Sequence, residues 1–225
     1  MPKTLILITN HFPFGSAEAF IETEYPFLER RFSNVFILCR DVVSKEIRHG
    51  NYNYNRFNPE SNWREYFLLI PLVLKHFGKV VQVLMEEISY LRTSQKLNAA
   101  NLIRCAHDLG KALVTSAHIE KIIKANKLSG EVVLYSYWLT SSALATTFVT
   151  SNSLSIRRIS RTHGGDVYEE RQTGNYLSFR NTLAKNLDAI FCTTQSGIDY
   201  LKLKVDSGFH HKFNLARLGT SRGGD

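Results

Sequence analysis

The sequence predicts an α/β fold: a doubly wound, mostly parallel sheet with a helical excursion at about 60–128. Short apolar runs without polar alternation recur along the chain, as in strands that are buried on both faces. Segments with helical spacing of apolar residues follow most of these runs, which is typical of βαβ units. The chain has 225 residues, of which 44% are hydrophobic, enough for one large domain with its own core.

The first 40 residues indicate a strand, a loop, a helix and a second strand. The strands are predicted at 4–9 and 34–40. Ser16 is the predicted N-cap of the helix between them, and Pro26 is expected to kink or break that helix late in its course. This order is that of a parallel βαβ unit.

The helical excursion follows a loop. Residues 41–63 are polar and aromatic, without strand or helix periodicity. The segment 64–92 is predicted to be mostly helical, with its apolar run interrupted by Pro71. A second helix is predicted at about 99–125 and is expected to be closed by Ser129 and Gly130. Its predicted apolar stripe comprises Leu102, Ala106, Leu109, Leu113 and Ala117.

Strands and helices alternate again in the last third of the chain. Strands are predicted at 132–138, 156–162, 189–194 and 213–218, and helices at 139–149, 176–185 and 196–203. The uncharged stretch 132–156 is long enough to span a bilayer. Eleven of its residues are Ser, Thr or Asn, so it is interpreted as a buried strand and a helix, and no transmembrane segment is predicted.

Charge and cysteine content limit the classes of function. Lys and Arg total 28 against 20 acidic residues, a formal net charge of +8 without a dense basic run. Such a surface suits an anionic membrane or phosphorylated substrates, and no nucleic-acid-binding motif is present, so no nucleic acid is expected. The three cysteines, Cys39, Cys105 and Cys192, are predicted to be buried reduced thiols, as in a cytoplasmic protein.

The loop after the first strand is one candidate binding site. Its backbone N–H groups and Gly15, at the predicted helix start, would suit a phosphate. In the alternative interpretation Gly15 only forms the turn. Glu18 would oppose an anion at this point, which favours a sugar hydroxyl near it.

The loops after two later strands are the other candidates. Two glycines after His163, Gly164 and Gly165, would let a ligand approach the backbone, and Asp166 could bind hydroxyls. A structural histidine is the alternative. The ring of Trp138 could stack on a sugar or seal the core.

Several chemistries are excluded by missing motifs. His-Gly-Gly occurs in the oxyanion loops of α/β-hydrolases, but the sequence has no G-x-S-x-G motif. The histidines and cysteines show no metal-ligand spacing such as H-E-x-x-H or C-x-x-C. No metal and no cofactor are therefore predicted.

Three segments together resemble the N-terminal halves of family 4 (retaining, group 1) glycosyltransferases of the GT-B fold. The first, FGSAEAFIETEYPFL at 14–28, resembles their Gly-rich loop and first helix. The second, SRTHGGDVYEER at 160–171, resembles the histidine loop of polysaccharide-making members. The third runs from NLDAIF at 186–191 through GIDYL at 197–201 to ARLGT at 216–220. Together these segments suggest a resemblance over nearly the whole chain, weakest at 41–130.

The resemblance implies a domain arrangement and a reaction. Family members have two Rossmann-like domains, with the acceptor mainly on the N-terminal one and the nucleotide-sugar donor mainly on the other. Nothing in the sequence matches the second domain, so residues 1–225 are expected to be a single acceptor-side domain that is inactive alone. The expected reaction moves a sugar from a nucleotide-sugar to a glycan or lipid-linked acceptor with retention, in the synthesis of a surface polysaccharide.

The resemblance also assigns roles to residues. Gly15 and Ser16 would line the cleft near the donor diphosphate, although many members have Gly-Gly at these positions. His163 would lie beside the transferred sugar and orient it rather than attack it. Stabilising the leaving diphosphate would then be the main catalytic task.

For residues 64–92 the resemblance suggests contact with the acceptor or with a membrane that holds it. The apolar run 67–74 lies beside Arg64, Lys75 and Lys79, as in an interfacial helix, which would place the protein at the inner face of a membrane. The alternative is a helical hairpin packed on the sheet. Two other functions stay open: a sugar-nucleotide epimerase of the same architecture, which needs carboxylates at the cleft, and a non-catalytic protein that binds glycans or a partner.

Overall fold

A computed structural model describes residues 3–40, 44–57 and 63–219, apart from the side chains of 63–68. Its centre is one sheet of seven strands in the order β3-β2-β1-β4-β5-β6-β7, in which every pair of neighbours is parallel. The strands are β1 (Lys3–Thr9), β2 (Asn34–Cys39), β3 (Tyr54–Arg56), β4 (Gly130–Ser136), β5 (Leu154–Thr162), β6 (Ala189–Cys192) and β7 (Phe213–Leu215). The predicted doubly wound fold is confirmed, and the sheet is fully parallel.

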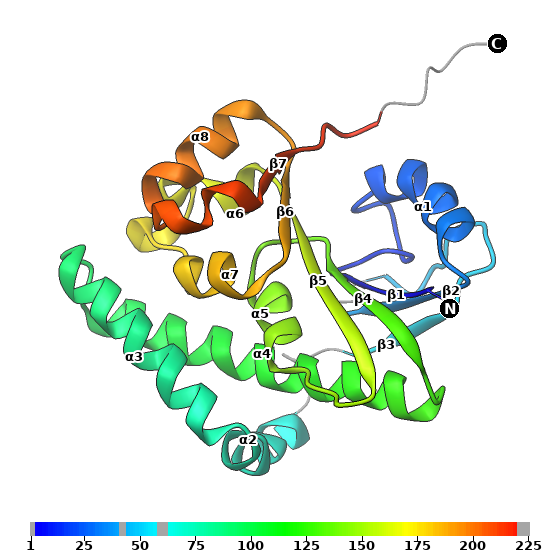
Figure 1. Ribbon diagram of the computed structural model, residues 1–225, viewed down its shortest axis with the longest axis horizontal. Helices are drawn as coiled ribbons and strands as arrows, with labels where there is room; N and C mark the ends of the chain where they lie inside the picture. Colours follow the sequence, from blue (N-terminus) through cyan, green and yellow to red (C-terminus); the bar gives the residue numbers. More distant parts are fainter. Residues whose placement is uncertain (1–2, 41–43, 58–62, 220–225) are drawn as a thin grey trace.

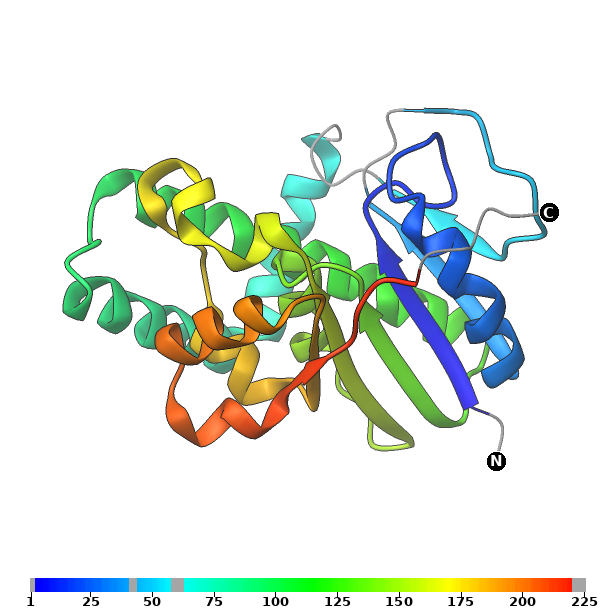
Figure 2. The ribbon, with the colours of Figure 1, turned by 90° about the horizontal axis from the view of Figure 1, so that it is seen from above.

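Eight α-helices are described: α1 (Phe20–Arg31), α2 (Trp63–Lys75), α3 (Phe77–Thr93), α4 (Ala99–Ala125), α5 (Ser141–Phe148), α6 (Gly164–Val167), α7 (Arg180–Asn186) and α8 (Gln195–Lys204). Figure 1 shows α1 on one face of the sheet and α4, α5 and α7 on the other. Helices α2, α3 and α4 form the predicted helical excursion. From β7 the chain crosses toward α1 (Figure 2), where Thr23 Oγ1 donates to the Gly219 carbonyl at 3.5 Å.

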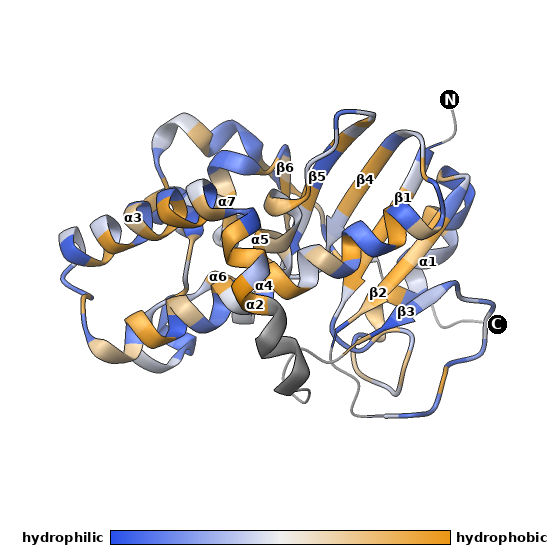
Figure 3. Cartoon of the chain, turned by 90° about the horizontal axis from the view of Figure 1, so that it is seen from below, coloured by the Kyte–Doolittle hydropathy of each residue, from blue (hydrophilic) through white to orange (hydrophobic). Residues whose placement is uncertain are grey.

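Alternate residues of the central strands fill two cores. Leu5 and Leu7 of β1 pack with Ile21 and Tyr25 of α1, whereas Ile6 and Ile8 pack with the helices of the opposite face. Strands that are apolar on both faces, such as β2 and β4 in Figure 3, are what a parallel sheet covered on both sides requires.

Chain direction places the strand ends. From β1 the chain moves outward to β2 and β3, whereas from β4 it moves the other way to β5, β6 and β7. Because β1 and β4 are neighbours in the sheet, the direction of winding reverses between them. Open α/β sheets bind their ligands at the carboxyl ends of the strands beside such a reversal.

The start of the first helix differs from the prediction. Helix α1 begins at Phe20 with Ala19 as N-cap, so the prediction that Ser16 caps it is wrong. Glu18 adopts a left-handed φ of 59°, which no helix can include. Pro26 lies inside α1, which continues to Arg31.

The excursion differs in detail. Residues 54–56 form β3 beside β2, where the sequence predicts a loop. Pro71 lies within α2, and the break between α2 and α3 is at His76 instead. The bounds of α4 agree with the prediction, but it ends at the C-cap Asn126 before a left-handed Lys127, while Gly130 begins β4.

The buried face of α4 is partly mispredicted. Leu109 and Leu113 are buried, but Leu102 is 40% exposed, whereas the core-facing residues one position earlier, Asn101 and Cys105, are buried. In the last third of the chain, the helix predicted to begin at 176 begins only at Arg180, after a left-handed Phe179.

Other predictions are confirmed. The uncharged stretch contains β4 and α5, and among the described helices none is long and apolar enough to cross a membrane. Cys39, Cys105 and Cys192 are buried free thiols.

Candidate functional site

The loops that follow β1, β4 and β5 meet at one edge of the sheet, and they carry most of the predicted site residues. The loop after β1 carries Glu18, the loop after β4 carries Trp138, and β5 leads directly into His163. The side chain of Trp138 contacts those of both Glu18 and His163 across the reversal of the winding.

Glu18 fills the place where a phosphate was predicted to bind. Its carboxylate accepts backbone N–H groups of Asn10 at 3.2 Å, His11 at 2.7 Å and Phe12 at 2.8 Å, and the indole N–H of Trp138. These backbone donors are the ones that an anion would need. In the loop after β1, the Glu18 carboxylate therefore occupies the backbone N–H groups that could otherwise bind an anionic ligand.

His163 lies in a stack of aromatic rings. Its ring centroid is 4.5 Å from that of Trp138, 5.0 Å from Phe20 and 5.4 Å from Tyr137. The residue is 8% exposed. Burial, together with the nearby Arg161 guanidinium, lowers the pKa of His163 to about 4, so the imidazole is neutral at physiological pH.

One nitrogen of this imidazole has an unsatisfied hydrogen-bonding capacity. The ring bonds to the backbone of Tyr137, but its Nε2 is buried and has no hydrogen-bond partner among the described residues. A buried polar atom without a partner is costly in a protein interior and is often found at functional sites.

A charged group supports the stack from below. Glu24 of α1 accepts the hydroxyls of Tyr135 at 3.1 Å and Tyr137 at 2.7 Å, and its carboxylate lies 3.3 Å from Nη1 of the buried Arg161. These contacts tie α1 to β4, to the loop after it and to β5, and Tyr137 belongs to the ring stack of His163. Sequence reasoning missed Glu24, which lies within the first of the three segments that carry the resemblance; Arg161 begins the loop that the sequence identified as a candidate.

Asp166 joins the ends of two strands. Its Oδ1 accepts the backbone N–H of His163 at 2.5 Å, and its Oδ2 accepts that of Leu139 at 2.8 Å. Burial raises the pKa of Asp166 to about 7. Both oxygens are used to hold the loop after β4 against the loop after β5.

A large hollow of about 1220 Å³ lies on one side of the Glu18–Trp138 contact. Gly15 and Ser16 line it, and Gly15 has a φ of +57°, which favours glycine. Arg48 donates to the carbonyls of Gly15 and Ala17 and pairs with Glu22 at 2.8 Å. The Arg48 side chain thus holds the backbone around Gly15 in place.

A smaller hollow of about 430 Å³ lies on the other side of that contact. From the predicted site it contains Trp138, Gly165 and Asp166. Leu139 and Thr140, from the same candidate loop as Trp138, also line it. The lining residues that sequence reasoning missed are Arg104, His107, Asp108, Lys111, Gln172, Leu177 and Ser178. The i, i+3, i+4, i+7 spacing of the four polar α4 residues was a readable signal for one face of a helix.

The structure thus divides the predicted residues into three groups. The half-buried Trp138 contacts the buried Glu18 and His163, Gly165 and Asp166 line the small hollow with Trp138, and Gly15 and Ser16 line the large one. Gly164 lines neither hollow: a Cβ there would lie 2.3 Å from Nη1 of Arg171. Within the described part of the chain, no group of three His, Cys, Asp or Glu residues could hold a metal ion.

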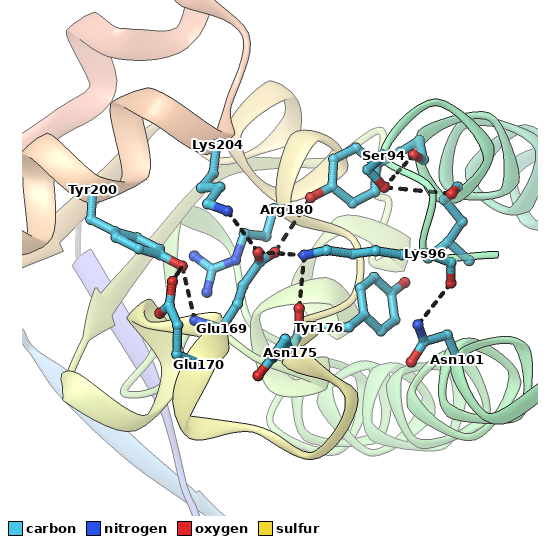
Figure 4. Close-up of polar contacts among 12 residues, drawn as sticks. Ser94, Lys96, Asn101, Glu169, Glu170, Asn175, Tyr176, Arg180, Tyr200 and Lys204 are labelled. Atoms are coloured by element: carbon cyan, nitrogen blue, oxygen red, sulfur yellow. Dashed lines mark hydrogen bonds and ion pairs between the residues drawn. The ribbon is translucent and has the colours of Figure 1, made fainter. Parts of the chain in front are cut away.

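The segment behind the small hollow is fixed by a second polar cluster (Figure 4). The buried carboxylate of Glu169 lies 2.6 Å from Lys96 Nζ and 3.0 Å from Lys204 Nζ, and it accepts the Tyr90 hydroxyl at 3.3 Å. Lys96 also donates to the carbonyl of Asn175 at 2.7 Å. The cluster connects α3, the connection between α3 and α4, and α8 to residues 169–175.

The chain is a Rossmann-like parallel α/β domain. No model of a known protein family matches it, and a search of curated proteins found no match either.

Proposed function

We propose that the chain is the acceptor-side domain of a retaining glycosyltransferase that takes its sugar from a nucleotide-sugar donor. The sequence resemblance at 14–28, 160–171 and 186–220 supports this, and so does the parallel α/β fold that the resemblance implies. The observation that carries most weight is the neutral imidazole of His163, with an unpartnered Nε2 at the carboxyl ends of β1, β4 and β5.

Each group at this edge suits one task in sugar transfer. His163 lines neither hollow, and its Nε2 is buried within the aromatic stack. Once a ring of the stack moves aside, the neutral Nε2 can accept a hydrogen bond from a sugar hydroxyl and thereby orient the sugar ring, without forming a bond to carbon. Trp138 offers an apolar ring face to the C–H groups of a sugar. Because Glu18 occupies the amides after β1, a donor diphosphate would lie in the large hollow beside Gly15 and Ser16 instead.

The carboxylates at the strand ends do not support the epimerase alternative. Proton abstraction needs a carboxylate that can reach the substrate. Those of Glu18 and Asp166 are both engaged by backbone N–H groups at the strand ends. A non-catalytic glycan-binding protein remains an outcome of the test.

The test is acceptor-dependent release of nucleoside diphosphate by the native protein, purified whole from cells that make it. Nucleotide-sugars are offered one at a time with a glycan or polyprenyl-phosphate acceptor. Release that requires the acceptor, with retention in the product, is the expected result. His163→Ala should reduce turnover about 100-fold, because a positioning contact to the reacting sugar is lost. Acceptor binding without any release would favour the non-catalytic alternative.

We further propose that α2 and α3 contact an anionic membrane surface on the cytoplasmic side. Exposed apolar side chains recur at helical spacing on each of the two helices: Ile70 and Leu74 on α2, and Phe77, Val81 and Met85 on α3. The opposite face, with Leu69, Leu72 and Val73, packs on the core. The exposed side chains support the interfacial interpretation, and the packed ones support the alternative in which this segment covers the sheet. The side chains of Arg64 and Phe67 lie outside the described residues.

Vesicle flotation tests this contact. The chain should float with phosphatidylglycerol vesicles at low salt, and the double variant Ile70→Ser, Met85→Ser should float less because apolar area is lost. Leu203→Ser, at an exposed leucine of α8, is the matched control. Equal flotation of all three proteins would contradict the proposed surface.

A further inference from the structure

One wall of the small hollow is a polar face of α4. Arg104, His107, Asp108 and Lys111 line it from successive turns of that helix. Helix α4 belongs to the excursion at about 60–128, where the family resemblance is weakest. The composition of this wall is therefore a property of this chain that the resemblance does not supply.

The charges on this wall favour an anion that also carries hydroxyls. Arg104 donates from Nη1 to the Tyr176 carbonyl at 2.8 Å and forms no ion pair with the described residues. Lys111 adds a second cation. Asp108 accepts the Ser178 hydroxyl at 2.5 Å and lies 3.8 Å from His107 Nδ1. Two basic side chains and one carboxylate thus line this wall, and the carboxylate can accept a further hydrogen bond from a hydroxyl group.

The opposite wall suits the body of a sugar ring. Trp138 contributes an aromatic ring that is only half-buried. A Cβ built on Gly165 meets no atom within 4 Å, so the backbone there is open to a ligand. Thr140, the N-cap of α5, also lines the hollow, and the positive end of that helix dipole adds to the field of the two cations.

The walls are held in place before any ligand binds. Residues 172, 177 and 178 line the hollow, and the same segment is anchored on its far side by the Glu169 cluster (Figure 4). Pre-organised polar groups in a concave site lower the entropic cost of binding. A volume of about 430 Å³ lies within the range of small-molecule sites.

We propose that this hollow binds an anionic sugar, a pyranose that carries a carboxylate or a phosphate, as part of the acceptor. That the sugar belongs to the acceptor rests on the proposed function, whereas binding of an anionic sugar in the hollow does not depend on turnover. Arg104 and Lys111 neutralise the anionic group, Asp108 accepts a ring hydroxyl, and Trp138 covers the apolar face of the ring.

Isothermal titration calorimetry of the full chain with glucuronate, glucose 6-phosphate and glucose tests the proposal. At least one anionic sugar should bind about tenfold more tightly than glucose, because charge-assisted hydrogen bonds are stronger than neutral ones. Affinity should fall as NaCl is raised about tenfold, from about 50 to about 500 mM, because the Debye length then shortens about threefold and the attraction between the charges is screened. Tighter binding of glucuronate assigns a carboxylate, and tighter binding of glucose 6-phosphate assigns a phosphate.

The double variant Arg104→Gln, Lys111→Gln should lose about tenfold in affinity for the anionic sugar. Its matched control is Lys121→Gln, Lys124→Gln, which removes the same charge from exposed positions of the same helix outside the hollow. Gly165→Ala provides a second variant, since its methyl group enters open space and cannot clash with the fold. It should weaken binding several-fold without a change in melting temperature.

Three results would overturn the proposal: no binding of either anionic sugar, equal affinity for glucose, or equal losses in the double variant and its control. The diphosphate-release assay separates this proposal from the proposed function. If the protein binds an anionic sugar but never releases nucleoside diphosphate, the proposed glycosyltransferase function is wrong and the proposed binding site stands. If the protein transfers sugar but its hollow binds no anionic sugar, the proposed function stands and the proposed binding site is wrong.

Discussion

Asp166 and Glu169 lie three residues apart in the segment after β5, and both are buried, yet their carboxyl groups have different surroundings. Asp166 faces the strand ends and accepts two backbone N–H groups. Glu169 faces the helices, where two lysines and a tyrosine surround its carboxylate. Arg180 reaches this loop from α7, but its Nη2 donates to the carbonyls of residues 166 and 167 rather than to either carboxylate.

The two environments shift the pKa of these carboxyls in opposite directions. Burial raises the pKa of Asp166 to about 7, since the backbone donors compensate its charge only in part. Burial also acts to raise the pKa of Glu169, but hydrogen bonds and charges from Lys96 and Lys204 outweigh it and lower the pKa. Glu169, on the side of the helices, is thus held by the positive charges of two lysines. Asp166, on the side of the candidate site, is held only by uncharged backbone N–H groups.

The largest effect should follow removal of the compensated charge. Glu169→Gln leaves Lys96, Lys204 and Arg180 without a buried counter-charge and should destabilise the fold by about 3 kcal/mol. Because the pKa of Glu169 is lowered in the folded state, its contribution is present above its unfolded pKa and is lost as the pH falls through the folded value. The loss should therefore be constant between pH 8 and 5 in urea denaturation. Glu170→Gln, at the exposed neighbour, should leave the midpoint unchanged; an equal loss in both variants would show that the two lysines compensate nothing.

A smaller and pH-dependent effect is expected at Asp166. A raised pKa means that the folded state binds a proton which the unfolded state does not, so stability increases as the pH falls from above 7 toward 4. The stability of the wild type relative to Asp166→Asn should accordingly rise by about 2 kcal/mol between pH 8 and 5. Urea midpoints of both proteins at the two pH values measure this. A difference that does not change with pH would mean that Asp166 stays ionised in the fold.

The smallest effect is expected at Glu18, the other carboxylate that neutral donors hold. Trp138→Phe removes the indole donor but leaves the N–H groups of residues 10, 11 and 12 on the carboxylate. The expected destabilisation is about 1 kcal/mol, the worth of one charge-assisted hydrogen bond among four. Phe20→Leu, which trims the same aromatic stack without touching Glu18, is the control for lost packing. A loss of more than twice that size at Trp138 would show that the indole alone holds the loop.

The sheet was predictable because apolar runs and helical periodicity are local signals. Strand β3 was not, since Tyr54–Arg56 is a three-residue, solvent-exposed edge strand whose only reason to be extended is its pairing with β2. The start of α1 was mispredicted because Ser16 is a residue type that commonly caps helices. Glu18 instead adopts a left-handed φ, and its carboxylate accepts N–H groups six to eight residues earlier, so the helix begins later. Such a contact has no periodicity in the sequence.

The candidate site was predictable as a set of loops but not as a set of contacts. Sequence order identified the residues that follow β1, β4 and β5, and the structure brings Glu18, Trp138 and His163 together there. Which residues are already engaged depends on the packing of all three loops. The α4 wall of the small hollow could not be anticipated, because α4 reaches the strand ends only through the folding of the whole excursion.

The most direct test of a sugar site at these strand ends is an NMR titration that follows the indole N–H resonance of Trp138. This resonance is assigned by its loss in Trp138→Phe, and the ligand added is glucuronate or glucose 6-phosphate. A saturable shift of the Trp138 resonance that is abolished in Arg104→Gln, Lys111→Gln is the predicted result, since Trp138 and the two cations line the same hollow. A Trp138 resonance that does not move at saturating ligand would contradict a sugar site at the ends of β4 and β5.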